Sequence, residues 1–494
     1  AACRTAERRL AELTDRYGLD TLLACVELNL TRSERRMREK IELLPDGEYY
    51  YEDYLETFGP KGFEPLLLPL ALTIRGDELT ADFTGVSPQV PVPVNSTLAV
   101  TAASVFITLK SALDPEQALN HGSFRPVEVI APEGTIVNVT HPAPAGSHGE
   151  IRKRVIACML GALARACPDL VSGDIHRTSF HNLIGGVDPA TGKEFVHYEW
   201  SSGGNGGFLE ADGPSAMAAI DWGDLSTAQP TEVLESRFPL HIEWSRQGTD
   251  SGGPGRNRGG LGMRRALKLT RGVAKYSLLS DGAMMPPFGI LGGESGAPVN
   301  SFVIHPDNSE HHFASPGKVG GHTLQAGDTV ILQSAGGGGY GDPLEREVER
   351  VADDVADGLV SRGTARNVYG VILTTDGFAD LEATKVQRDQ LRAARITVSA
   401  VEDDTDAYTP SGPSKKRVLR LNPEDIKHAG LVDGDRAELL IGDGAPLRGW
   451  VRPDATVAAG RVPLDPLGCR ALGADASASL ILRPLLVPDP GSIG

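Results

Sequence analysis

The segment DSGGPGRNRGG, residues 250–260, holds five glycines in eleven positions and decides how the middle of the chain folds. Two more glycine clusters flank it in the sequence, GGNGG at residues 203–207 and GGGGYG at residues 336–341. Short β-forming stretches, such as residues 195–200 and 329–333, alternate with these clusters, and this rhythm predicts a β-rich body. The glycines either let the backbone approach a ligand or another chain closely, or they form turns between strands.

Composition indicates a globular protein. The 494 residues are 40% hydrophobic and 23% charged, and we find no apolar run of about 18 residues, so no membrane span is expected. The net charge of −17 repels phosphate backbones, which makes nucleic acid an unfavourable partner. The five cysteines are scattered without a C-x-x-C spacing and fit a cytoplasmic location. The chain begins with Ala1 inside a helical pattern, so we expect an upstream segment.

Apolar periodicity predicts the α+β fold class and four parts along the chain. A β-hairpin is expected around the Gly76-Asp77 turn, and helices are expected near residues 96–113 and from Ile151 to Leu163. The four parts are a helical hairpin at residues 1–48 that continues a missing N-terminal part, a β-rich body at 49–375, a connector at 376–415 and a small β-barrel at 416–494.

Three histidines and two carboxylates lie close together in the sequence, on either side of the helix expected from Ile151 to Leu163. Imidazole suits metal ligation or proton transfer near neutral pH, although loop histidines also often only bond to backbone. Glu150 stands at a helix start, where it either caps the helix or contacts a ligand. The candidate catalytic residues are His148, Glu150, His176 and His181, and the candidate substrate-binding residues are Asp174, Gly204, Asn205 and Gly206.

Familiar catalytic motifs are missing from the sequence. It contains no G-x-x-x-x-G-K-[ST] phosphate loop, and the glycines around Arg256 do not open a helix after a strand. It also contains no G-x-S-x-G nucleophile motif. A self-contained nucleophilic hydrolase or nucleotide-binding enzyme is therefore poorly supported.

Five ordered segments together resemble the hydantoinase B/oxoprolinase family, over residues 1 to about 373. They are NLT at residues 29–31 continuing to Met37, DFTGVSP at 82–88, FRPVEVIAPEG at 124–134, DSGGPGRNRGG at 250–260 and GGGGYGDP at 336–343. The resemblance implies a subunit of a hetero-oligomer that works beside a hydantoinase A-like, actin-like ATPase subunit, which would hold ATP and magnesium. Phosphorylation turns an amide or a ketone into a better electrophile, and the missing phosphate loop fits that division of labour.

The resemblance also leaves choices open. It implies a divalent metal such as zinc or manganese, held by an upstream hydantoinase B segment, so no metal ligand is assigned to this sequence. Where the family has a G-N-x-E-type motif this chain reads GSHGE at residues 146–150, and only Glu150 corresponds. We expect a subunit of an ATP-dependent hydrolase of cyclic amides, namely hydantoin, oxoproline or a lactam. The alternatives are a subunit of an acetone- or acetophenone-type ketone carboxylase and a non-catalytic scaffold.

Overall fold

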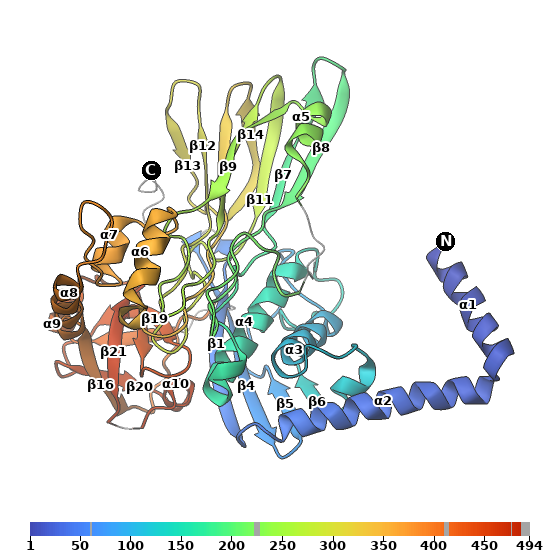
Figure 1. Ribbon diagram of the computed structural model, residues 1–494, viewed down its shortest axis with the longest axis horizontal. Helices are drawn as coiled ribbons and strands as arrows, with labels where there is room; N and C mark the ends of the chain where they lie inside the picture. The colour runs from blue at the N-terminus through green and yellow to red at the C-terminus, as the bar shows by residue number, and fades with distance from the viewer. Residues whose placement is uncertain (60–61, 222–227, 410–413, 476, 486–494) are drawn as a thin grey trace.

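The structure is a computed structural model that describes residues 1–59, 62–221, 228–409, 414–475 and 477–485. A helix-and-sheet layer, an upper pair of sheets and a C-terminal barrel surround a central layer of glycine-rich loops (Figure 1). This arrangement confirms the predicted α+β, β-rich class. None of the helices within the described ranges combines the length and apolar character that a membrane crossing needs.

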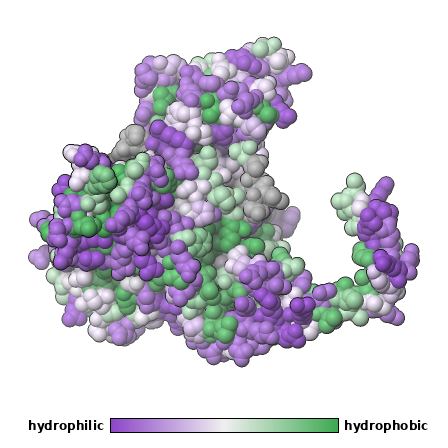
Figure 2. Space-filling view, viewed as in Figure 1, coloured by the Kyte–Doolittle hydropathy of each residue, from purple (hydrophilic) through white to green (hydrophobic). Residues whose placement is uncertain are grey.

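The N-terminal residues form two helices, α1 (Ala2–Tyr17) and α2 (Leu19–Ile41), joined at Gly18. The helices themselves were predicted, but they do not fold back on each other as a hairpin: α2 projects from the body and α1 turns away at its far end (Figure 1). Only Met37 and Ile41 of these helices are buried. Apolar patches therefore remain on the surface of α1 and α2 (Figure 2).

The lower layer is a four-stranded sheet covered by two helices. Its elements are β1 (Gly47–Leu55), β4 (Leu66–Arg75), β5 (Glu78–Asp82), β6 (Val127–Ile130), α3 (Leu98–Leu113) and α4 (His148–Ala166), with the short strands β2 (Phe58–Gly59) and β3 (Gly62–Phe63) beside them. The strand order is β1-β4-β5-β6, and β4 and β5 form the predicted hairpin. Almost all of α4 is buried, and Gly161 lets it lie directly on the ring of Tyr51.

The upper part is a sandwich of two sheets that share one apolar core. Its elements are β7 (His181–Asp188), β8 (Lys193–Trp200), α5 (Thr231–Arg237), β9 (Leu240–Gln247), β10 (Met263–Leu269), β11 (Val273–Leu279), β12 (Asn300–Ile304), β13 (Glu310–His312), β14 (Lys318–Gln325) and β15 (Thr329–Gln333). The sheet orders are β13-β12-β15-β10-β9 and β14-β11-β7-β8. Phe180, Tyr276 and Leu332 lie in the core between them. The strands predicted at residues 195–200 and 329–333 are confirmed in β8 and β15.

Between these parts the glycine-rich segments pack against one another. We call the segments 203–207, 252–260 and 336–341 the glycine bundle. Its backbone groups bond from segment to segment: Gly207 N–H donates to the Gly338 carbonyl at 2.9 Å, and Gly337 N–H to the Gly260 carbonyl at 2.9 Å. A Cβ added to Gly259 would lie 2.0 Å from the Gly337 oxygen. Close approach is therefore what the glycines provide, and what they approach is other backbone of the same chain.

In the described residues, the C-terminal part combines five helices with a nearly closed six-stranded barrel. Its elements are α6 (Val348–Ala356), α7 (Arg362–Asn367), α8 (Leu381–Ala393), β16 (Ile396–Glu402), β17 (Val418–Leu421), α9 (Pro423–His428), β18 (Arg436–Leu440), β19 (Leu447–Pro453), β20 (Arg461–Leu464), α10 (Pro466–Leu472) and β21 (Ser479–Pro484), with sheet order β17-β19-β18-β21-β16-β20. Strand β16 and helix α8 lie inside the expected connector at 376–415, so the barrel begins before residue 416. Buried Arg417 ties it to the body through Glu52 at 2.7 and 2.8 Å.

Candidate functional site

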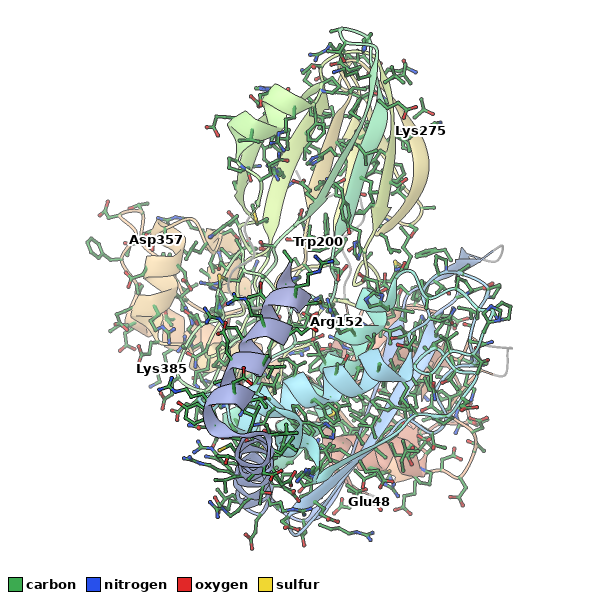
Figure 3. All side chains as sticks on the ribbon, turned by 90° about the vertical axis from the view of Figure 1, so that its right-hand side faces the viewer. Glu48, Arg152, Trp200, Lys275, Asp357 and Lys385 are labelled. Carbon is green, nitrogen blue, oxygen red and sulfur yellow. The ribbon has the colours of Figure 1, made fainter. Side chains whose placement is uncertain are left out.

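The candidate site lies where the first turn of α4, the loop before β7, strand β8 and the start of the glycine bundle meet. Figure 3 shows Trp200 at the base of the upper sheets, with Arg152 of α4 close below it. The loop at residues 174–180 is buried, and Arg177 and Phe180 have positive φ of 61° and 50°. Residues other than glycine adopt this conformation only when their surroundings hold them there, so the loop is a fixed part of the site.

Glu150 is fully buried in the first turn of α4 and faces the loop rather than its own helix. Its Oε1 accepts a hydrogen bond from the Ser179 N–H at 3.0 Å and lies 3.8 Å from Nε2 of His181. Gly149 permits this approach, since a Cβ there would come within 2.9 Å of the Ser179 hydroxyl. Burial raises the pKa of Glu150 above its ordinary value, and Lys318 opposes that shift. The hydrogen bond to Ser179 favours a role in the site over capping of α4.

His181 connects Glu150 to an aromatic pair on β8. Its Nδ1 lies 2.5 Å from the Tyr198 hydroxyl and accepts the Trp200 Nε1–H at 3.0 Å. An Nδ1 that accepts this hydrogen bond places the proton of the neutral ring on Nε2, which faces Glu150. Burial lowers the pKa of His181 to about 4, and nearby Lys153 adds to that effect. His181 is therefore uncharged near neutral pH, and its Nδ1 lone pair lies on the side of the aromatic residues, where it accepts the Trp200 N–H.

A cavity of about 390 Å³ opens beside the aromatic pair. Tyr198, Trp200, His176 and Gln229 are among its walls. Burial lowers the pKa of His176 to about 3, so this imidazole is also neutral, and Gly203 lies so close that a Cβ would come within 2.4 Å of it. The cavity has the size of a small-molecule site and offers ring faces, neutral polar groups and the carboxylate of Glu199, which pairs with Arg265 at 2.6 Å.

The other sequence candidates lie apart from this cavity. His148 is exposed at the start of α4. Asp174 is fully buried and pairs with Arg177 Nε at 2.9 Å. Gly204 and Gly206 lie in the glycine bundle, where a Cβ would come within 1.9 Å of the Gly260 and Gly173 oxygens. Their proposed contact with a substrate stays a prediction, and their visible role is backbone packing.

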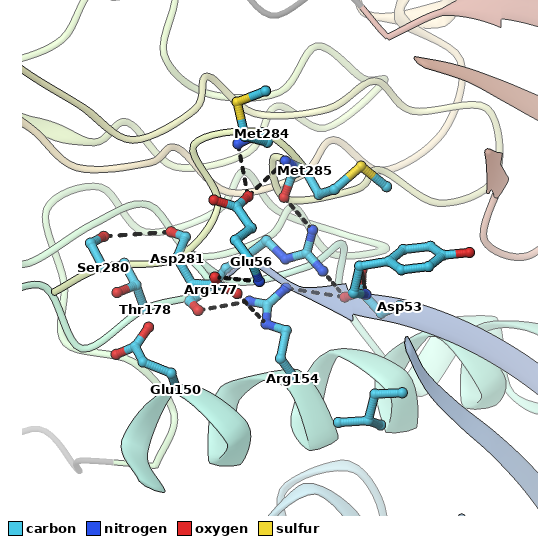
Figure 4. A network of polar contacts seen from close by, with 12 residues as sticks. Asp53, Glu56, Glu150, Arg154, Arg177, Thr178, Ser280, Asp281, Met284 and Met285 are labelled. Carbon is cyan, nitrogen blue, oxygen red and sulfur yellow. Dashed lines mark hydrogen bonds and ion pairs between the residues drawn. The ribbon is translucent and has the colours of Figure 1, made fainter. Parts of the chain in front are cut away.

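A buried network of charges behind the loop was not found from the sequence (Figure 4). Arg154 of α4 pairs with Asp53 of β1 at 3.1 Å and with Asp281 at 3.3 Å, and Lys318 pairs with Asp281 at 3.1 Å. Glu56 accepts the N–H groups of three consecutive residues, 283–285, at 2.7 to 3.1 Å. Burial and the neighbouring Asp281 raise the pKa of Glu56 to about 7. The network fixes the loop between the two layers.

The described residues do not fit a metal site. Within the ranges that the structure describes, no three His, Cys, Asp or Glu side chains gather so that they could hold an ion. The divalent metal implied by the family resemblance therefore has no ligand set here, and we derive no chemical step through it.

Comparison with known proteins identifies the family. Residues 1–343 match the description hydantoinase B/oxoprolinase, and the chain belongs to this family. It is 32% identical over 400 residues to the B-type subunit of a putative D-/L-hydantoinase of Pseudomonas sp. strain NS671, covering 78% of this chain and 66% of that protein. The crystal structure of an ATP-dependent caprolactamase from Pseudomonas jessenii matches with TM-score 0.71 and 31% identity, covering 78% of this chain and 68% of that one.

A carboxylase subunit is a more distant relative. The acetophenone carboxylase delta subunit of Aromatoleum aromaticum is 24% identical over 412 residues, covering 75% of this chain and 60% of that protein. The chain spans 66% of the length of the hydantoinase subunit and 60% of that of the carboxylase subunit.

Proposed function

We propose that this chain is a subunit of an ATP-dependent cyclic-amide hydrolase that lines the substrate chamber beside an actin-like ATPase subunit. The observation that carries the proposal is the difference in identity between relatives: 32% to a hydantoinase subunit and 31% to a caprolactamase, against 24% to a carboxylase subunit. The cavity beside Tyr198 and Trp200 supports it, because flat ring faces and neutral polar groups suit a small uncharged ring, and the carboxylate of Glu199 in its wall is already paired with Arg265.

His181 is the proposed proton carrier for ring opening. A water molecule would first take the place of the Trp200 N–H at Nδ1. Nδ1 then takes a proton from that water as the water oxygen bonds to the amide carbon, and it returns the proton to the ring nitrogen as the carbon–nitrogen bond breaks. Glu150, 3.8 Å from Nε2, stabilises the imidazolium that forms between the two steps. His181 is then the catalytic residue and Glu150 a positioning residue.

The activating phosphate would come from outside this chain. A hydantoinase A-like subunit would bind ATP and magnesium and transfer the γ-phosphoryl group to the amide oxygen, which makes the amide carbon a better electrophile. Breaking the carbon–nitrogen bond then leaves an acyl phosphate, and a second water releases inorganic phosphate from it and gives the carboxylate of the product. An upstream hydantoinase B segment would hold the divalent metal, zinc or manganese. The assembled enzyme would be a hetero-oligomer in the cytoplasm.

A ketone carboxylase subunit is the second candidate, favoured by the acetophenone carboxylase relative. In that reaction the phosphorylated species is an enol, which attacks carbon dioxide or bicarbonate, and the same neutral imidazole would remove the proton that allows enol formation. The third reading is a scaffold, in which the cavity and His181 take no part in turnover.

Phosphate release by the assembled complex separates these functions. The panel contains hydantoin, 5-oxoproline, caprolactam and acetone, each with and without bicarbonate. The proposal expects ATP turnover with at least one cyclic amide in the absence of bicarbonate, together with ring-opened product. Turnover only with acetone and bicarbonate would establish the carboxylase instead, and turnover that is unchanged in the His181→Gln variant would establish the scaffold.

A further inference from the structure

A second cavity, of about 590 Å³, is lined by residues that follow the candidate site in the sequence. It lies at the junction of the glycine bundle, α8 and the barrel. Its lining includes residues 340–345, where the last bundle segment ends, and residues 481–484 of β21 in the barrel. Its volume is in the range of cavities that enclose whole small molecules. The proposed reaction does not use it.

Arg256 brings an uncompensated positive charge to this cavity. Its backbone N–H donates to the Gly341 carbonyl at 3.1 Å, and its guanidinium lies 5.8 Å from the centre of the Tyr340 ring. Among the described residues, no carboxylate pairs with it and no side-chain hydrogen bond is made. The other two arginines of the cavity differ, because Arg395 binds both oxygens of Asp342 at 2.7 Å and Arg483 binds Glu438 at 2.7 Å.

Glu294 brings an uncompensated negative charge to the same cavity. Its backbone is fixed, since its N–H donates to the Pro254 carbonyl at 2.7 Å and its carbonyl accepts the Gly339 N–H at 2.9 Å. Its carboxylate has no hydrogen bond or ion pair with the rest of the described chain. Burial raises the pKa of Glu294, and the charges of Arg483 and Arg395 only partly offset this.

We infer that this cavity binds a zwitterionic amino acid, with its carboxylate on Arg256 and its ammonium group on Glu294. A partly buried charge without a partner is costly, and a ligand that carries one charge would leave the other side chain uncompensated. A ligand with both charges satisfies both. Because Arg256 lies in the glycine bundle and the Glu294 backbone is hydrogen-bonded to it, the separation of the two side chains selects the distance between the two charged ends of the ligand.

Calorimetric titration of the full chain tests this inference without ATP or turnover, so its outcome is independent of the proposed function. The probes are glycine, 4-aminobutyrate and 6-aminohexanoate, with hexanoate and hexylamine as single-charge analogues. We expect one of the three amino acids to bind at one site per chain, and the single-charge analogues to bind at least about tenfold more weakly.

Four variants locate the site. Arg256→Gln and Glu294→Gln should each weaken binding at least about tenfold, because each leaves one end of the ligand without its partner. The matched controls Arg366→Gln and Glu382→Gln change exposed charges on α7 and α8 and should bind like the parent. Thermal unfolding of each variant confirms folding. The inference is overturned if none of the amino acids binds at about 10 mM, if hexanoate or hexylamine binds equally well, or if the cavity variants match the controls.

Discussion

Replacing Gly259 by alanine should unfold the molecule more easily, because the glycine bundle has no room for a side chain. The new Cβ would lie 2.0 Å from the Gly337 oxygen and 2.9 Å from the Gly338 oxygen, where ordinary contacts begin at 3.4 Å. Segment 336–341 would therefore have to move by more than an ångström. It is held by hydrogen bonds from Gly337 N–H to Gly260 at 2.9 Å and from Gly338 N–H to Asp174 at 2.8 Å.

The expected loss is about 3 kcal/mol of unfolding free energy. Overpacking costs about 1–3 kcal/mol, and loss of two buried backbone hydrogen bonds adds about 1 kcal/mol each. The lower entropy of alanine in the unfolded chain returns about 0.4–1 kcal/mol. The control is Gly320→Ala in β14, where nothing lies within 4 Å of the new Cβ. Urea unfolding of both variants is the assay, and equal midpoints for the two would refute the reasoning.

Three further predictions concern other parts of the molecule. Arg417→Met removes the arginine that pairs with the buried carboxylate of Glu52 and should lower the free energy of unfolding in urea by about 3–5 kcal/mol. The control Arg452→Met changes an exposed arginine of the same barrel and should lower it by less than about 0.5 kcal/mol. Equal losses in the two variants would contradict a buried pair. His176 has a folded pKa of about 3, below its ordinary 6.5, so the unfolded chain binds the extra proton and the free energy of unfolding falls as pH drops below about 6.5. His176→Gln should reduce that fall by up to about 1.4 kcal/mol per pH unit. An unchanged dependence of unfolding free energy on pH would argue against a neutral buried ring. Glu150→Gln should lower kcat of the assembled enzyme at least about tenfold and move the acid limb of its pH–rate profile to lower pH, because the His181 imidazolium loses its counter-charge. An unmoved acid limb would leave Glu150 a purely structural role.

Periodicity predicted the regular elements well because local pattern determines them. The β4–β5 hairpin at Gly76, helix α4 and strands β8 and β15 all follow from apolar spacing and turn residues. The hairpin expected at residues 1–48 was wrong in its packing: the spacing of Leu10, Leu13 and Tyr17 shows an apolar face but not what that face contacts.

The glycine bundle shows where sequence reasoning reaches its limit. Glycine clusters indicate backbone conformations and contacts that exclude a side chain, but the contacts join segments 50 to 130 residues apart, and no local pattern encodes which segment meets which.

The candidate site was predictable in part. Glu150, His176 and His181 stood out because two histidines and a carboxylate near a helix start are chemically distinctive, and the structure brings Glu150 and His181 to 3.8 Å. Tyr198 and Trp200 were missed because aromatic residues on an expected strand usually indicate core, whereas both are about half exposed at the mouth of a cavity. Asp53 and Glu56 were missed because burial of a carboxylate depends on long-range packing.

One measurement tests most directly whether His181 carries the proton in ring opening: the amount of ring-opened product that the assembled enzyme forms when it carries His181→Gln. The matched control is the same enzyme with His428→Gln, which changes an exposed histidine. We predict that product formation from a cyclic amide falls at least about a hundredfold in the first variant and is unchanged in the second, with ATP and the partner subunit present in both. Equal product formation by the two variants would contradict it.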